Sequence, residues 1–146
     1  LDLLGRKVLG DMGTRLRKLG KIIKDFIEEE GVRKPMAEFI DPLAELAKTF
    51  EKLTMEIGMK AMMNRDEAGA VAVPYLRIAG HVVYAYLFAR MAKIALSRKG
   101  SGDTFYEAKL ATARFYFARL LPETASQIAA VRSGSSTLMA LDAALF

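Results

Sequence analysis

The sequence predicts an all-α protein, a mostly antiparallel bundle of four main helices with short helical segments at its C-terminal end. Four long segments place apolar residues at alternating spacings of three and four, which is the period of an amphipathic α-helix. No stretch alternates apolar and polar residues with period two between turn signals, so we expect no strand. A chain of 146 residues, 52% hydrophobic and 27% charged, suits one domain with one core and excludes a disordered protein.

The first predicted helix covers residues 12–30. Its apolar stripe consists of Met12, Leu16, Leu19, Ile23 and Phe26. The acidic run 28–30 is unfavourable at the negative end of a helix dipole, and Gly31 suits the left-handed conformation that commonly follows a helix. We therefore expect this helix to end at Glu30.

The second predicted helix runs from Pro35 to about Met63, because proline suits the first turn of a helix. Its stripe consists of Met36, Ile40, Leu43, Ala47, Phe50, Leu53 and Ile57. Pro42 lies inside this pattern and either delays the start of the helix or kinks it.

The third predicted helix runs from about Ala68 to Ser97, after Asn64 and Asp66 as candidate N-caps. One stripe consists of Ala72, Leu76, Ala79, Val83, Leu87, Met91 and Ile94. The other side is largely apolar as well, through Tyr75, Val82, Tyr86 and Ala89. A helix that is apolar on most faces is usually buried, so we expect this one to be central to the bundle.

The same helix is long enough to cross a bilayer, since residues 68–89 carry only one full charge, Arg77. Near the middle of a membrane that arginine would cost about 2.5–3.5 kcal/mol, and the alanine-rich sequence around His81 contributes little in return. We therefore expect no membrane span.

Residues 98–104 (RKGSGDT) have the chemistry of a loop between helices, and a fourth helix is predicted over residues 105–121. Its stripe consists of Tyr106, Leu110, Ala113, Phe117 and Leu120. Pro122 either kinks this helix or begins a fifth segment that ends at Val131. A turn at 133–136 (SGSS) then precedes a short last helix predicted over residues 137–145.

The residue types exclude several kinds of site. The sequence contains no cysteine, which excludes disulfides, thiolate nucleophiles and cysteine-ligated iron–sulfur clusters. With His81 as its single histidine, the chain cannot supply two imidazoles to one metal ion, so a ferritin-type diiron centre is excluded. His81 lies within an apolar helix, and we expect it to be a hydrogen-bonded packing residue, with a functional role left open.

The net charge of +5 comes from the N-terminal part of the chain. Residues 1–24 hold two acidic groups, Asp2 and Asp11, against seven basic ones, which are Arg6, Lys7, Arg15, Arg17, Lys18, Lys21 and Lys24. Such a run can attract phosphate, but no aromatic residue lies among residues 6–24 to stack on bases. A solvated helix face is therefore favoured, and no nucleic-acid partner is expected.

Three segments resemble one protein family over nearly the whole chain. They are residues 1–8 (LDLLGRKV), 68–92 (AGAVAVPYLRIAGHVVYAYLFARMA) and 105–122 (FYEAKLATARFYFARLLP). Together they resemble the C-terminal extension of flavin-dependent acyl-CoA dehydrogenases, in the branch that includes 3-methylmercaptopropionyl-CoA dehydrogenases. Tyr84, Ala85 and Tyr86 depart from that pattern, because many relatives have glycine or tryptophan there.

The resemblance implies a domain organisation and a parent enzyme. In that family a D-L-x-G-R-K segment, here residues 2–7, follows shortly after the motif that carries the catalytic glutamate. We therefore expect residues 1–146 to be a single helical domain and a C-terminal piece of a larger cytoplasmic enzyme, with residues 1–11 as the connector from the preceding dehydrogenase domains. The parent would bind FAD, desaturate an acyl-CoA substrate and form a homo-oligomer, whereas this chain would hold neither the base nor the flavin.

The resemblance also singles out residues for packing or for contact between domains, and none for catalysis, cofactor or metal binding. They are Pro74, Tyr75, Leu76, Arg77, Gly80, Lys109, Arg114, Phe115, Tyr116 and Pro122. The expected function is an accessory domain that covers a pocket, packs on the enzyme core or extends an oligomer interface. A free-standing helical interaction module is the alternative.

Overall fold

A computed structural model describes residues 1–11 and 13–145. Its elements are η1 (Asp2–Leu9), α1 (Thr14–Glu30), η2 (Lys34–Met36), α2 (Ala37–Met63), α3 (Asp66–Ser97), α4 (Thr104–Phe115), η3 (Tyr116–Leu120), α5 (Glu123–Ser133) and η4 (Ala143–Leu145). No strand occurs among the described residues, so the predicted all-α class is confirmed.

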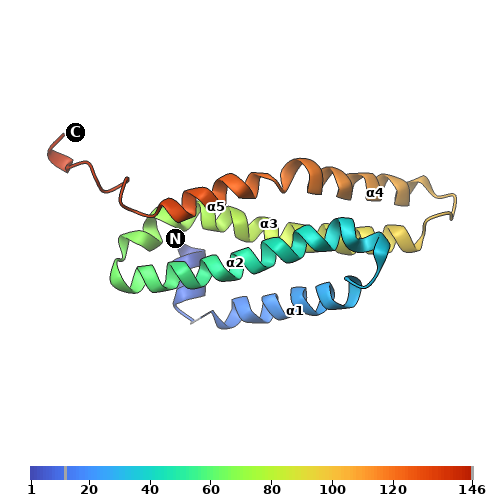
Figure 1. Cartoon of the computed structure of the whole chain (residues 1–146), viewed down its shortest axis with the longest axis horizontal. Coiled ribbons are helices and arrows are strands. Elements are labelled where there is room, and N and C mark those ends of the chain that lie inside the picture. Colours follow the sequence, from blue (N-terminus) through green and yellow to red (C-terminus); the bar gives the residue numbers. More distant parts are fainter. Residues whose placement is uncertain (12, 146) are drawn as a thin grey trace.

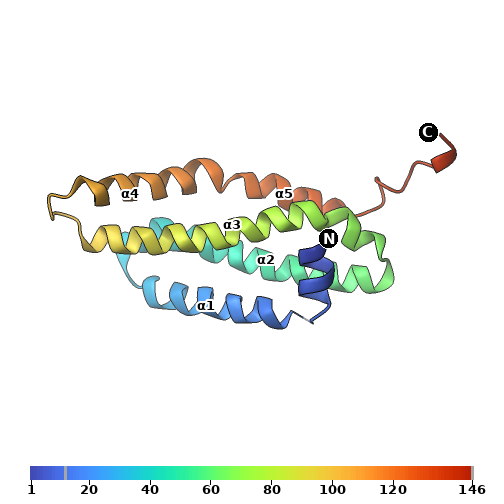
Figure 2. The same ribbon diagram turned by 180° about the vertical axis from the view of Figure 1, so that it is seen from behind.

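The bundle is built around α3, which packs against α2, α4, α5 and η1. In Figure 1 and Figure 2, α4 and α5 follow one another along one side of α3, and α1 lies on the opposite side of the α2–α3 pair. The short helix η1, of the wide π type, crosses the bundle near one end and buries Leu4 and Val8 in the core. Residues 2–9, expected as part of a connector, are therefore helical and packed.

The core lies mainly between α2 and α3. The stripe predicted for the second helix is confirmed. Met36, Ile40, Leu43, Phe50, Leu53 and Ile57 are buried, and Ala47 is partly buried and packs against the core. The α3 residues that meet them are Val71, Tyr75, Ile78 and Val82. Burying an aliphatic or aromatic side chain of this size contributes about 1.5–3 kcal/mol, so this seam is the main source of stability.

The face of α3 that lies in the core differs from the predicted stripe. Leu76, Leu87 and Ile94 are 55%, 48% and 56% exposed, whereas the opposite side, centred on Ile78, is buried. Because α3 is apolar on most sides, its periodicity could not decide which side faces α2. By length and hydropathy α3 also passes the test for a membrane span, as core helices of globular proteins do, and one such helix is weak evidence for a membrane.

Polar side chains surround the start of α3. The N-cap position is Arg65, without a capping side-chain bond, so neither predicted N-cap residue occupies it. Asn64 lies one residue earlier and its Oδ1 accepts a hydrogen bond from the backbone N–H of Asp66 at 3.0 Å, while Asp66 lies in the first turn. Glu67 accepts bonds from the hydroxyl (2.7 Å) and the backbone N–H (3.3 Å) of Ser135. These bonds tie the end of α5 to the start of α3.

The fourth helix does not continue as an α-helix to Leu121. After Phe115 it widens into the π-type segment η3, in which the N–H of Leu121 bonds the carbonyl of Tyr116 at 3.0 Å. Pro122 has no N–H to donate and its ring would crowd the preceding turn, which explains a wider turn at this point. As a result Tyr116 is buried and Leu120, predicted for the core, is 46% exposed.

Four further predictions need correction or fall outside the described residues. Gly31 ends α1 in a right-handed conformation (φ −63°), because its N–H still bonds the carbonyl of Ile27. Residues 137–142 are not helical, since the chain leaves the bundle there (Figure 1) and a short helix without a buried face is marginal. Pro42 lies within α2 and does not delay its start. Met12, predicted for the first stripe, lies outside the described residues.

Candidate interdomain contact surface

The residues singled out by the resemblance are divided between the core and the surface. Tyr75 and Tyr116 are buried, whereas Leu76 and Phe115 are more than half exposed. Pro74, Gly80 and Lys109 are half-buried, and Arg77, Arg114 and Pro122 are exposed. The structure therefore brings them together as one set only in part, and their role in contact with another domain stays a prediction.

Tyr75 joins α3 to α2 inside the core. Its hydroxyl lies 2.9 Å from Thr54 Oγ1, and its ring centroid lies 5.0 Å from that of Phe50. Burial raises the pKa of Tyr75 above its ordinary value, and the bond with Thr54 only partly opposes this. The phenol is therefore neutral and acts as a packing group with a satisfied hydroxyl.

Tyr116 joins the π-type segment to α3. Its hydroxyl donates a hydrogen bond to the backbone carbonyl of His81 at 3.1 Å and lies 3.0 Å from His81 Nδ1. Its ring stacks on Phe88 with centroids 4.4 Å apart and 13° between planes. Burial, with a smaller effect of Tyr84, raises the pKa of Tyr116 well above its ordinary value, so the hydroxyl keeps its proton. His81 is thus a hydrogen-bonded packing residue, as predicted.

The outer side of this joint is charged. Glu123, at the start of α5, has one carboxylate oxygen 3.9 Å from His81 Nε2 and the other 3.4 Å from an Arg77 guanidinium nitrogen. These three side chains connect α3 to α5 beside the wide turn. Arg77 is thereby placed at the edge of the outward face of α3.

Two other residues singled out by the resemblance lie on α4. Arg114, in its last turn, makes a two-pronged ion pair with Glu38 of α2, at 3.0 Å from Nε and 2.7 Å from Nη2. Hydrogen bonding to Glu38 raises the pKa of Arg114. Lys109 Nζ lies 5.1 Å from the ring centroid of Phe105, one turn earlier. The Arg114 pair thus holds α4 on α2, whereas the Lys109 contact lies within α4.

A buried ion pair at the end of α1 was missed by the sequence reasoning. The side chain of Glu30 is 2% exposed and bonds Lys93 Nζ at 2.6 Å and an Arg33 guanidinium nitrogen at 2.9 Å. Burial alone would raise the Glu30 pKa, but these two hydrogen bonds outweigh it and lower the pKa. The acidic run at the end of a helix was the available signal, because an unfavourable placement needs a compensating cation.

The outward face of α3 carries an apolar row. Val73, Leu76, Tyr84, Leu87 and Ile94 are between 48% and 64% exposed, and Gly80 lies in the middle of them. The periodicity of the sequence identified Leu76, Leu87 and Ile94 as one stripe of a helix expected at the centre of the bundle. In the structure this stripe is about half exposed.

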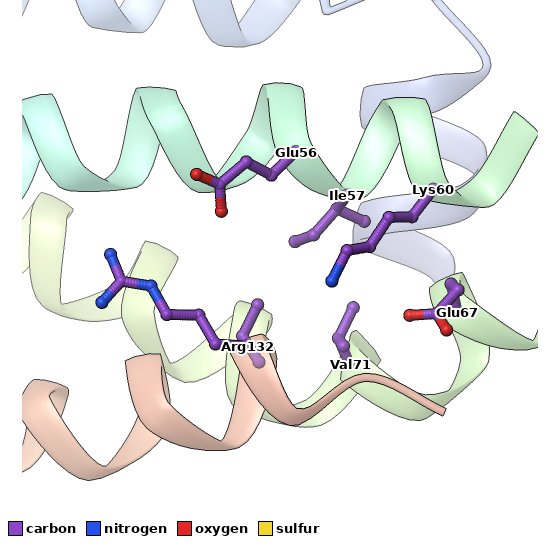
Figure 3. Close-up of a pocket in the computed structure, with 7 residues that line it drawn as sticks. Glu56, Ile57, Lys60, Glu67, Val71 and Arg132 are labelled. Carbon is purple, nitrogen blue, oxygen red and sulfur yellow. The ribbon is translucent and has the colours of Figure 1, made fainter. Parts of the chain in front are cut away.

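Two hollows stand out among the described residues. Figure 3 shows the first, where Glu56 and Lys60 of α2, Glu67 and Val71 of α3 and Arg132 of α5 converge around about 10 Å³ of free space. That is close to the volume of one water molecule. The second is an open depression of about 490 Å³ between α1 and α3. No group of three metal-binding side chains is present in the described part of the chain.

Comparison with known proteins points to one family. A family model described as "Acetyl-CoA dehydrogenase C-terminal like" matches residues 19–142. The chain is also 24% identical, over 157 aligned residues, to a Mycobacterium tuberculosis protein named broad-specificity linear acyl-CoA dehydrogenase FadE5. That alignment covers 99% of this chain and 26% of the relative, so the chain spans about a quarter of the curated relative that it matches.

Proposed function

Because the chain belongs to the acetyl-CoA dehydrogenase C-terminal-like family, we propose that it is the accessory C-terminal helical domain of a flavin-dependent acyl-CoA dehydrogenase. The observation that carries this proposal is the family match over residues 19–142, which includes α2 to α5 entirely. The helical bundle is compatible with a packing role, since its polar clusters are ion pairs and hydrogen bonds between helices.

The parent would remove two hydrogens from an acyl-CoA thioester, and FAD would supply the hydride acceptor when bound. The family match concerns the C-terminal part of such enzymes, so we assign the catalytic base and the flavin to other parts of the parent. Contributions left to this domain are apolar surface, shape and an oligomer contact. The domain would make these contributions without supplying a reactive group.

We place the parent in the branch that includes 3-methylmercaptopropionyl-CoA dehydrogenases, and in the cytoplasm. Support for the branch comes from the residues around Pro74 on α3 and around Tyr116 at the end of α4. The chain length of the acyl group is not assigned. Residues 1–11 would connect the domain to the preceding part of the enzyme.

Two preparations test this function. The intact parent, encoded with the sequence upstream of Leu1, should purify with bound flavin that is bleached by a saturated acyl-CoA under anaerobic conditions. The 146-residue chain prepared alongside it should be colourless and inactive. A parent without flavin or acyl-CoA-dependent bleaching, or stoichiometric flavin binding by the 146-residue chain, would overturn the proposal.

A further inference from the structure

The outward side of α3 holds a row of apolar residues with no charged residue among them. Its members recur at spacings of three and four and therefore lie along one side of the helix; they are Gly69, Val73, Leu76, Gly80, Tyr84, Leu87, Met91 and Ile94. We call this set the α3 apolar row. Figure 2 shows α3 nearest the viewer, with α4 and α5 on one flank and α1 on the other.

The central part of the α3 apolar row is symmetric about Gly80. Leu76 and Tyr84 each lie four residues from it, and Val73 and Leu87 each lie seven residues from it. A two-fold axis perpendicular to the helix at Gly80 would therefore set these four large side chains beside one another in two copies. Met91 would then lie beside Gly69 of the second copy, and Ile94 would lie beyond the symmetric part. Self-complementarity of this kind is what a symmetric dimer interface requires, and an unrelated partner does not require it.

No close contact among the described residues explains why position 80 is a glycine. A Cβ added there would meet no atom within 4 Å, so neither α2 nor α4 needs the space. Glycine is less favourable than alanine in a helix interior, because it loses more backbone freedom on folding. At a contact between helices, however, the missing side chain lets the two backbones approach closely.

We propose that the α3 apolar row pairs with the same row of a second copy of this chain, in antiparallel orientation with the two-fold axis at Gly80. Leu76 would lie beside Tyr84 of the second copy, and Val73 beside Leu87 of the second copy. Arg77, on one flank, would come next to Tyr84 of the second copy, where a guanidinium over an aromatic ring is favourable. This inference does not depend on the proposed enzymatic parent.

The size of the α3 apolar row sets the expected affinity. A row of this length on a helix is about 38 Å long and about 10 Å wide, which gives on the order of 400 Å² per copy. That is the size of an apolar patch that often has a function. Two such faces bury less than the roughly 1,200 Å² typical of stable complexes, so we expect a weak dimer with a Kd of micromolar or above.

Cross-linking tests the geometry directly, because the chain has no cysteine of its own. In an antiparallel pair, Leu76→Cys and Tyr84→Cys chains mixed together should form a disulfide-linked dimer under mild oxidation. Neither variant should link to itself, since equal positions are then about 12 Å apart along the helix, beyond the reach of a disulfide. Met55→Cys, equally exposed on α2, is the matched control that should link to nothing.

Sedimentation velocity on the 146-residue chain tests the affinity. The average mass should rise towards that of a dimer between about 1 and 500 µM, and Leu76→Asp should weaken dimerisation at least tenfold with an unchanged circular dichroism spectrum. Met55→Asp, a change at an equally exposed position on α2, should leave dimerisation as it is. A monomer throughout, equal weakening by both variants, or self-linking by Leu76→Cys alone would overturn the proposal. A monomer would instead favour coverage of the row by another part of a larger protein.

Discussion

The hydroxyl of Tyr116 donates to the backbone carbonyl of His81 at 3.1 Å and lies 3.0 Å from Nδ1 of the same histidine. A phenol has a single proton, so His81 Nδ1 must be the donor in the second bond. Both bonds reach across from η3 to α3 at the point where the helix widens before Pro122. The side chain of one residue thus holds the wide turn against the centre of the bundle.

Tyr116→Phe should therefore destabilise the chain by about 1–2 kcal/mol, because two polar groups of His81 lose their partner while the ring packing on Phe88 stays. Urea unfolding followed by circular dichroism measures this. Tyr106→Phe, on α4 outside this joint, is the control and should change the free energy of unfolding by less than about 0.5 kcal/mol. Equal effects of the two variants would contradict the role given to the Tyr116 hydroxyl.

The buried carboxylate of Glu30 should make stability depend on acid. Its pKa in the folded chain lies below the ordinary 4.5, so its stabilisation is present above that pH and is lost as pH falls through the lowered value. Glu30→Gln should lower the free energy of unfolding by about 1–3 kcal/mol at pH 7, and that free energy should then fall less steeply below about pH 4.5. Glu29→Gln, whose side chain is 68% exposed, should change neither the free energy of unfolding nor its pH dependence. Urea titrations at a series of pH values measure both quantities.

Two glycines should respond in opposite ways to alanine. Gly80 lies in a helix with open space at its Cβ position, so Gly80→Ala should stabilise the dilute chain by about 0.5–1 kcal/mol. Gly134 has φ +69°, and a Cβ there would lie 2.9 Å from Glu67 Oε2, so Gly134→Ala should destabilise by about 1–3 kcal/mol. Thermal melts at low concentration compare the two. Destabilisation by Gly80→Ala would mean that this position is packed after all.

The buried side of a helix could be predicted from the sequence only where charged residues mark the opposite side. In α2 the charged residues leave only one apolar face, so Ile40, Leu43 and Leu53 were correctly placed in the core. In α3 nearly every face is apolar, and only the neighbouring helices decide that Ile78 is inside while Leu76 is outside. Periodicity records which residues share a side and not what covers that side.

The contacts between helices were the least predictable part of the candidate surface. Pro122 indicated a break in the helix. The register of the wide turn, however, depends on where α3 lies, and it is this register that buries Tyr116. The ion pair of Glu30 with Lys93 joins residues 63 positions apart. The acidic run at the end of the helix indicates that a cation is needed, but a single sequence does not identify Lys93 as that cation.

The basic segment, residues 1–24, should lie against the preceding part of the parent enzyme. Its charges are largely met by neighbours in sequence: Lys21 bonds Asp25 at 2.7 Å, and Lys24 lies 3.8 Å from Glu28. Such pairs favour a solvated or docked face over a phosphate site. Hydrogen exchange should therefore show residues 1–24 less protected in the 146-residue chain than in the intact parent, and equal protection in both would count against docking.

The competing role of this segment is phosphate recognition, and a salt titration separates the two. Binding that depends on releasing counterions from DNA or anionic vesicles weakens steeply as salt rises. We expect only weak, nonspecific binding by the chain, because Lys21 and Lys24 of α1 already have acidic partners one turn away. Specific binding of about 10⁻⁸ M or tighter at physiological salt, lost when Arg17, Lys21 and Lys24 are changed to alanine, would replace docking with phosphate recognition.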